Sequence, residues 1–142
     1  QDNPVAWTLK IDTPNKSFKA GDTFNVQISA HIQPGWHLYS LTKLENGPIA
    51  TSIKLEEDQP FEQVGGVKSP DPIVTFDPNF NLDTEYYEKS VAFTLAVKVL
   101  PNFCIKKTPQ AAHIYVTLMR QGMCAFYLLQ LLIQGAISCT NL

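Results

Sequence analysis

Apolar residues alternate with polar residues along three long segments of the first hundred residues. The clearest, residues 24–32, reads FNVQISAHI, and the same period of two recurs in residues 5–11 and 91–99. In a strand this period places every second side chain on one face, so each segment predicts a strand with one buried face. The expected core positions are Val5, Trp7, Leu9, Ile11, Phe24, Val26, Ile28, Ala30, Ile32, Val91, Phe93, Leu95, Val97 and Val99.

Turn-forming residues separate these segments, as in KAGDT (19–23) and QPGW (33–36). Residues 52–56 and 113–118 predict two shorter strands. Because no helical stretch lies between the expected strands, the pattern indicates an all-β chain built as an antiparallel sandwich. Prolines recur through residues 58–88, so we expect a long and mostly irregular connection there.

The charge pattern excludes one large class of functions. The net charge is −2, and the eleven lysines and arginines are scattered rather than gathered in a stripe, so no nucleic-acid surface is expected. No G-x-S-x-G motif or glycine-rich phosphate loop is present. His31, His37 and His113 lack the spacing of metal ligands on one element. The sequence therefore predicts no metal and no cofactor, and it identifies no small-molecule substrate.

Two groups of aromatic residues are candidates for binding. GWHLYS (35–40) places Trp36 and Tyr39 directly after a Pro-Gly turn, and Tyr86 and Tyr87 are adjacent further along. We expect such aromatics to pack against the core, with a ligand-stacking or partner-binding surface as the alternative. Adjacent residues on a strand face opposite sides, so one of the two tyrosines should be exposed.

The C-terminal part of the chain breaks the alternation. From Met123 to Ile133 only Gln130 is polar. As a helix, eleven residues would rise only about 16 Å, roughly half of what a bilayer core requires, so a membrane span is excluded by length. We expect an irregular or short helical tail over residues 119–142, outside a sandwich domain of residues 1–118.

The chain has three cysteines, which are Cys104, Cys124 and Cys139. An odd number fits neither a set of paired disulfides nor the paired C-x-x-C spacing of a zinc site. Residue 1 is Gln, so we expect a chain that has been processed or cut from a longer one.

Four stretches together identify a resemblance: PGWHLYS, GPIATSIKLE (47–56), FDPNFNLDTEYYEKSVAFTLAVKV (76–99) and VTL (116–118). From about Pro4 to about Leu118 the chain resembles the amino-terminal periplasmic domain of DsbD and the related disulfide-bond corrector domains. The resemblance implies an immunoglobulin-like β-sandwich that is part of an exported protein and lies in the periplasm. It also implies a thiol–disulfide relay that acts as a protein-disulfide reductase. The implied partners are a membrane-embedded electron donor domain and thioredoxin-like proteins that repair disulfides or mature cytochrome c.

In this family a cysteine pair on a hairpin near the C-terminal end performs the exchange. Cys124 stands where one of the two is expected, but Met119, five residues before it, and Leu129, five residues after it, are not cysteines. A single thiol can form a mixed disulfide but cannot resolve it. Two interpretations follow: an impaired relay domain with Cys124 as its catalytic residue, or a redox-silent sandwich that binds or scaffolds other periplasmic proteins.

A frameshift would explain the unusual tail. If Ala125–Gln134 uses ordinary codons with CTN leucines, the frame that begins on each codon's third base permits Cys followed by Leu-Leu-Pro-Pro-Thr. That reading is similar to the ending of the family. The coding DNA tests the hypothesis, which fails if neither other frame continues into a strand that contains proline and threonine.

Overall fold

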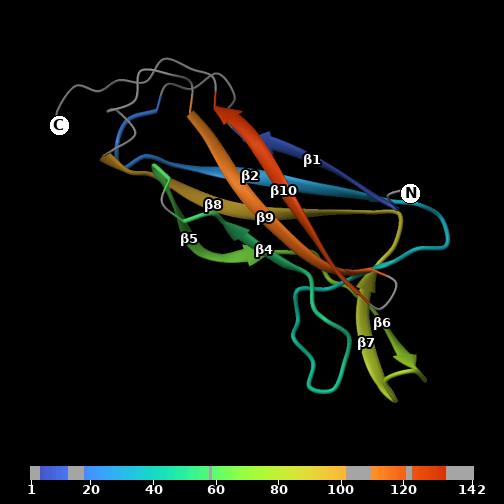
Figure 1. Cartoon of the computed structure of the whole chain (residues 1–142). Helices are drawn as coiled ribbons and strands as arrows, with labels where there is room; N and C mark the ends of the chain where they lie inside the picture. Colours follow the sequence, from blue (N-terminus) through green and yellow to red (C-terminus); the bar gives the residue numbers. More distant parts are fainter. Residues whose placement is uncertain (1–3, 13–17, 58, 102–109, 121–122, 134–142) are drawn as a thin grey trace.

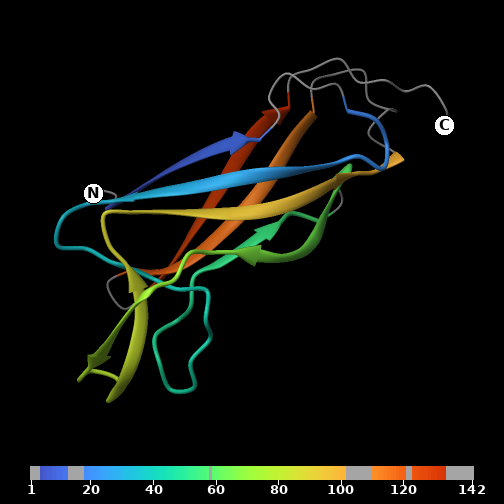
Figure 2. The ribbon, with the colours of Figure 1, turned by 180° about the vertical axis from the view of Figure 1, so that it is seen from behind.

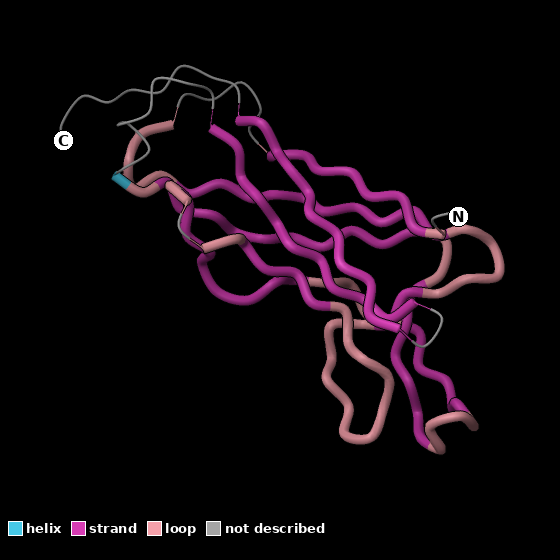
Figure 3. The backbone as a smooth tube through the Cα atoms, in the orientation of Figure 1, coloured by secondary structure: helices cyan, strands magenta, loops and turns pink. Residues whose placement is uncertain are grey.

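The computed structural model describes residues 4–12, 18–57, 59–101, 110–120 and 123–133. Within these ranges the regular structure consists of β-strands, and no α-helix occurs; the short segment coloured as helix in Figure 3 is a 3₁₀ turn at Pro101. No helix in the described part of the chain is long and apolar enough to span a membrane. The strands are β1 Val5–Ile11, β2 Thr23–Ile32, β3 Leu38–Tyr39, β4 Ser52–Leu55, β5 Phe61–Lys68, β6 Ile73–Asp77, β7 Leu82–Tyr87, β8 Ser90–Val99, β9 Gln110–Arg120 and β10 Met123–Ile133.

The strands form two layers and a small extension. One layer has the order β1-β2-β8-β5, the other has the order β10-β9-β4, and every pairing is antiparallel. The third sheet, β3-β7-β6, projects beyond one end of the two layers as a hairpin (Figures 1 and 2). This architecture is that of an immunoglobulin-like β-sandwich, so the predicted fold class is confirmed.

The core lies between the two layers and follows the alternation of the sequence. In β2 and β8 the residues at every second position are buried, and Ile28 lies directly across from Phe93 in the register of the two strands. From β9, Ile114 and Val116 close the core on the other side. Each such side chain stabilises the fold by about 1.5–3 kcal/mol through its removal from water. The deepest positions are Val26, Ile28, Phe93, Leu95, Val97, Ile114 and Val116.

The prediction of an irregular connection over residues 58–88 is wrong, because three strands, β5, β6 and β7, occupy most of it. In β5 the pairing with β8 shifts register between Val64 and Lys68, and Gly65 has a positive φ of 72°. Such a bulge interrupts the period of two and so conceals the strand in the sequence.

The prediction of an irregular or short helical tail is also wrong over Met123–Ile133. These residues form β10, which pairs with β9 along its whole length. Alternation marks strands with one buried face, whereas a continuous apolar run is equally compatible with a strand, which explains the error. The expected domain boundary after Leu118 falls inside β9, and the division of the chain into two parts stays a prediction. The rest of the tail, residues 134–142, lies outside the described residues.

Candidate functional site

A cluster of aromatic rings lies on the small sheet. Tyr39 of β3 and Tyr86 of β7 are paired in register, and the ring of His37 lies 4.9 Å from the ring of each. Phe80, in the turn between β6 and β7, extends the cluster with its ring 6.5 Å from that of Tyr39. The pairing of β3 with β7 and the turn after β6 therefore bring four rings together: His37, Tyr39, Phe80 and Tyr86.

The Tyr39 hydroxyl lies in an environment that favours its protonated form. Burial of the half-buried ring raises the pKa of Tyr39 above its ordinary value of 10.0, and the Asp77 carboxylate raises it further. A negative phenolate would lose hydration and approach another negative charge. Tyr39 is therefore a neutral hydrogen-bonding group across the physiological pH range, and it is unsuited to act as a base.

Polar contacts fix the loop between β3 and β4 against this cluster. The Ser40 hydroxyl donates to Glu85 Oε2 at 2.9 Å and accepts from the Thr42 N–H at 3.1 Å. The Thr51 hydroxyl donates to the Tyr39 carbonyl oxygen at 2.6 Å, and the Thr51 N–H donates to the Ser40 carbonyl oxygen at 2.9 Å. Ser40 and Thr51 are both buried, so these hydrogen bonds satisfy groups that water does not reach.

The structure distributes the remaining predicted aromatics differently. Trp36 is 36% exposed in the turn after β2, so the expectation that it packs in the core is wrong. The positive φ of Gly35, 83°, turns the chain there, and the Trp36 N–H donates to the Gln33 carbonyl at 3.1 Å. The turn thus provides a hydrogen-bond partner for the backbone N–H of Trp36, and the indole ring does not need to enter the core. Its role in binding stays a prediction.

Tyr87 is a core residue, whereas its neighbour Tyr86 is half-buried, so the two rings face opposite sides. The Tyr87 ring packs edge-on against Phe93 at 5.8 Å, and its hydroxyl donates to the Pro70 carbonyl oxygen at 2.7 Å. Of the two tyrosines, Tyr86 is therefore the one that solvent or a partner can contact.

Cys124 is the second residue of β10, and Met119 of β9 lies opposite it in the register. Ser52 pairs with Thr117, and Thr51 is hydrogen-bonded to Ser40, so this end of β9 lies next to β3. Figures 1 and 2 show the same end of the β9–β10 pair beside the base of the β6–β7 hairpin. The aromatic cluster and the backbone of Cys124 therefore belong to the same end of the molecule. Cys104 and Cys139 lie outside the described residues.

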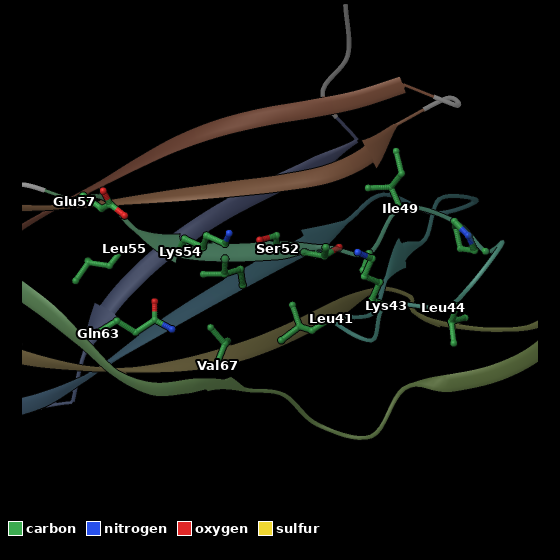
Figure 4. Close-up of a pocket in the computed structure, with 15 residues that line it drawn as sticks. Leu41, Lys43, Leu44, Ile49, Ser52, Lys54, Leu55, Glu57, Gln63 and Val67 are labelled. Carbon is green, nitrogen blue, oxygen red and sulfur yellow. The ribbon is translucent and has the colours of Figure 1, made fainter.

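A separate open groove lies between the free edges of β4 and β5 (Figure 4). Its volume is about 920 Å³, and Gln63 and Val67 rise into it from β5. Within the sheet, β4 and β9 separate the groove from β10, so it is distinct from the site of Cys124. The apolar residues that line it are Leu41, Leu44, Pro48, Ile49, Ala50, Ile53, Leu55 and Val67.

The described residues contain no group of three histidine, cysteine or acidic side chains that could hold a metal ion. His31 and His37 are both exposed and lie on different elements. The side chain of His113 lies outside the described part. Among the described residues, the backbone of Cys124 lies on the β9–β10 hairpin at the end of the molecule that carries the aromatic cluster.

Comparisons with known proteins identify the fold and the family of the chain. No curated protein sequence matches the chain. A solved structure, the N-terminal periplasmic domain of ScsB from Proteus mirabilis, has the same fold with a TM-score of 0.58 at 14% identity. The match covers 93% of this chain but 47% of that one, so the chain spans about half of its length. The family model of the thiol:disulfide interchange protein DsbD, N-terminal, matches residues 9–125, a range that includes Cys124. The chain therefore belongs to the family of DsbD N-terminal domains.

Proposed function

We propose that the chain is a periplasmic thiol–disulfide relay domain that passes reducing equivalents to thioredoxin-like partners, with Cys124 as its reactive residue. The observation that carries the proposal is the position of Cys124 at the end of the β9–β10 hairpin, within the residues that match the family. Membership in the family supports thiol–disulfide exchange as the general activity. The partners, the compartment and the role of Cys124 are part of the proposal.

The exchange would begin with attack of the Cys124 thiolate on a disulfide sulfur of the partner. A new bond forms between the two sulfurs, the partner's own disulfide breaks, and its second sulfur leaves as a thiolate that takes up a proton. A second thiol of the relay domain must then attack the Cys124 sulfur to release the partner as a dithiol. Met119 occupies the opposite position in the register, and a thioether cannot perform this step.

The chain as it stands would therefore stop at the mixed disulfide, unless the partner's own thiol attacks and reverses the first step. We infer an impaired relay. The opposing Met119 also favours a second function, a redox-silent module that binds or scaffolds periplasmic proteins. In that case Tyr86 and Trp36, which are accessible, would contribute to the binding surface.

A trapping experiment distinguishes the two functions. The full chain is mixed with a thioredoxin-like protein whose second active-site cysteine is replaced by serine and whose first carries a thionitrobenzoate disulfide. Attack by Cys124 then releases thionitrobenzoate, and the adduct cannot be reversed by a second thiol of the partner. We expect an adduct with the summed mass of both proteins that disappears on reduction. It should be absent from Cys124→Ser and retained in Cys104→Ser and Cys139→Ser.

An adduct that survives in Cys124→Ser would reject Cys124 as the reactive residue. No adduct with the unmodified chain would reject the relay. In that event, binding of the same protein that is unchanged by Cys124→Ser would support the scaffolding function.

A further inference from the structure

The strand β6 forms the outer edge of the small sheet. In the register it pairs with β7 from Ile73 opposite Tyr86 to Asp77 opposite Leu82, and β7 is the only strand paired with it among the described residues. Its outer edge therefore presents backbone N–H and C=O groups with no neighbouring strand. The hairpin projects away from the two main layers, so this edge faces solvent (Figures 1 and 2).

Three of the five side chains of β6 are apolar, and these three are exposed although they lie on both faces of the strand. Ile73 is 45%, Val74 58% and Phe76 55% exposed, and these are three of the six large apolar residues of the described chain that are exposed. Edge strands are normally protected by charges, prolines or a covering segment, because a bare apolar edge invites pairing with another chain. An exposed apolar edge in a folded domain therefore indicates a surface that a partner covers.

The chain holds this edge in a defined conformation. The Tyr87 hydroxyl donates to the Pro70 carbonyl oxygen at 2.7 Å and fixes the chain just before the strand. After it, the Asn79 N–H donates to Asp77 Oδ1 at 2.9 Å, and Asn81 takes the positive φ of 54° that closes the turn. Pro72 and Pro78 flank the strand and limit it to five residues. The edge is thus a short, preformed template.

The segment that contains this edge is acidic. Residues 69–88, which are bracketed by Lys68 and Lys89, include five carboxylates and no lysine or arginine. By contrast, the whole chain has thirteen acidic and eleven basic residues, so the acidity is local. The carboxylates are Asp71, Asp77, Asp83, Glu85 and Glu88.

We propose that β6 is a docking strand that binds an extended segment of another protein by strand addition, and that this segment carries apolar residues in its middle and lysine or arginine at its ends. The partner's backbone would pair with the free edge, and its central side chains would cover Val74, Phe76 and Ile73. Its basic ends would lie near the carboxylates on either side of the strand. The proposal does not depend on the thiol of Cys124.

The charge pattern decides against a second copy of the chain as the occupant. Pairing of two β6 edges would bring two segments with five carboxylates each into contact. Like charges across a strand pair are destabilising, and a locally uniform charge keeps such surfaces apart. A partner segment with basic ends is instead attracted by these carboxylates, which favours its binding.

The test uses the full chain and three synthetic peptides with blocked ends. The first peptide is Lys-Val-Thr-Ile-Thr-Val-Lys, the second has Glu in place of both Lys, and the third has Pro in place of the central Ile. Binding is measured by NMR titration, and amide exchange is followed in β6. We expect the first peptide to bind at least about tenfold more tightly than the second, with a smaller difference at high salt. Amide exchange at the outer edge of β6 should slow in its presence, and the third peptide should not bind, because proline cannot complete the ladder.

Two variants locate the site. Val74→Lys places a charge on the exposed edge and should weaken binding of the first peptide by about tenfold or more. Val64→Lys makes the same change at an exposed position of β5, 43% accessible, and should leave binding unchanged. Equal effects of the two variants, equal binding of the Lys and Glu peptides, or unaltered exchange in β6 would each overturn the proposal. Dimerisation of the unliganded chain that Val74→Lys abolishes would do the same and would identify a second copy as the occupant.

Discussion

Met119 of β9 lies directly across the ladder from Cys124 of β10. In antiparallel sheets, opposite Cα atoms are about 4.5–5.5 Å apart and their side chains share a face. This separation lies within the range of about 4.4–6.8 Å that disulfides span. The position that lacks a second thiol is therefore also the position from which a thiol would reach Cys124.

Met119→Cys, in a background of Cys104→Ser and Cys139→Ser, should form a disulfide with Cys124. The expected mass of the oxidised protein is lower by two hydrogen atoms, and its mixed disulfide with a thioredoxin-like protein should be released rather than accumulate. The matched control is Leu118→Cys, because Leu118 pairs with Ala125 and lies on the opposite face. Equally ready closure in the control would contradict the register.

Tyr39 should make the stability of the fold fall at alkaline pH. Its folded-state pKa is raised above the ordinary 10.0, mainly by burial and also by Asp77. The protonated phenol is therefore favoured by folding, and its contribution is complete below pH 10.0 and is lost as the pH rises through the folded-state pKa. Urea unfolding at increasing pH should show a smaller alkaline loss in Tyr39→Phe than in the unmodified chain.

Asp77→Asn should bring the Tyr39 titration part of the way back toward 10.0. The amide keeps an oxygen that can accept from the Asn79 N–H but removes the negative charge, while burial of the ring is unaltered. NMR of chains with labelled tyrosine ring carbons measures the midpoint. A midpoint that does not move would show that burial alone sets the pKa of Tyr39.

Tyr87→Phe should reduce the free energy of unfolding by about 1 kcal/mol, since it removes the hydrogen bond to the Pro70 carbonyl oxygen. The same change should accelerate amide exchange in β6, which begins three residues after Pro70. Tyr86→Phe deletes the equivalent hydroxyl on the other face of β7 and should change stability by less than about 0.5 kcal/mol. Equal reductions of the free energy of unfolding in both variants would show that the hydrogen bond of the Tyr87 hydroxyl has no special role.

Phe93→Ala should be among the most destabilising single changes, with a loss of about 3–5 kcal/mol. The ring is fully buried between the layers and packs against Tyr87. Denaturant unfolding followed by tryptophan fluorescence measures the loss. His31→Ala, on the exposed side of the neighbouring strand, serves as the control and should lie within about 0.5 kcal/mol of the unmodified chain.

The parts of the fold that could be predicted are the strands with one buried face and one solvent-exposed face. In β2 and β8 this asymmetry produces an alternation of apolar and polar residues in the sequence. Val26 and Leu95 are buried as expected. The strand β6 has no buried face, so Val74 and Phe76 carry no period that reveals it. In β5 the bulge at Gly65 removes the period instead.

The candidate site could be predicted only in part, for a similar reason. Tyr39 and Tyr86 were identified by residue type, but their pairing with His37 and Phe80 depends on a register that no local pattern specifies. The Asp-Pro-Asn turn after β6, which positions Asp77 beside Tyr39, is the signal that could have indicated the cluster.

The pairing of β2 with β8 has a consequence for how the chain folds. Thr23 pairs with Lys98, so the central ladder of the sandwich joins residues that are 75 positions apart in the chain (98 − 23). Closing so long a loop is entropically costly, and domains dominated by distant pairings fold in milliseconds to seconds. The β6–β7 hairpin, which pairs Asp77 with Leu82 across a short turn, needs no such search. In refolding, the pairing of β6 with β7 should therefore precede the pairing of β2 with β8.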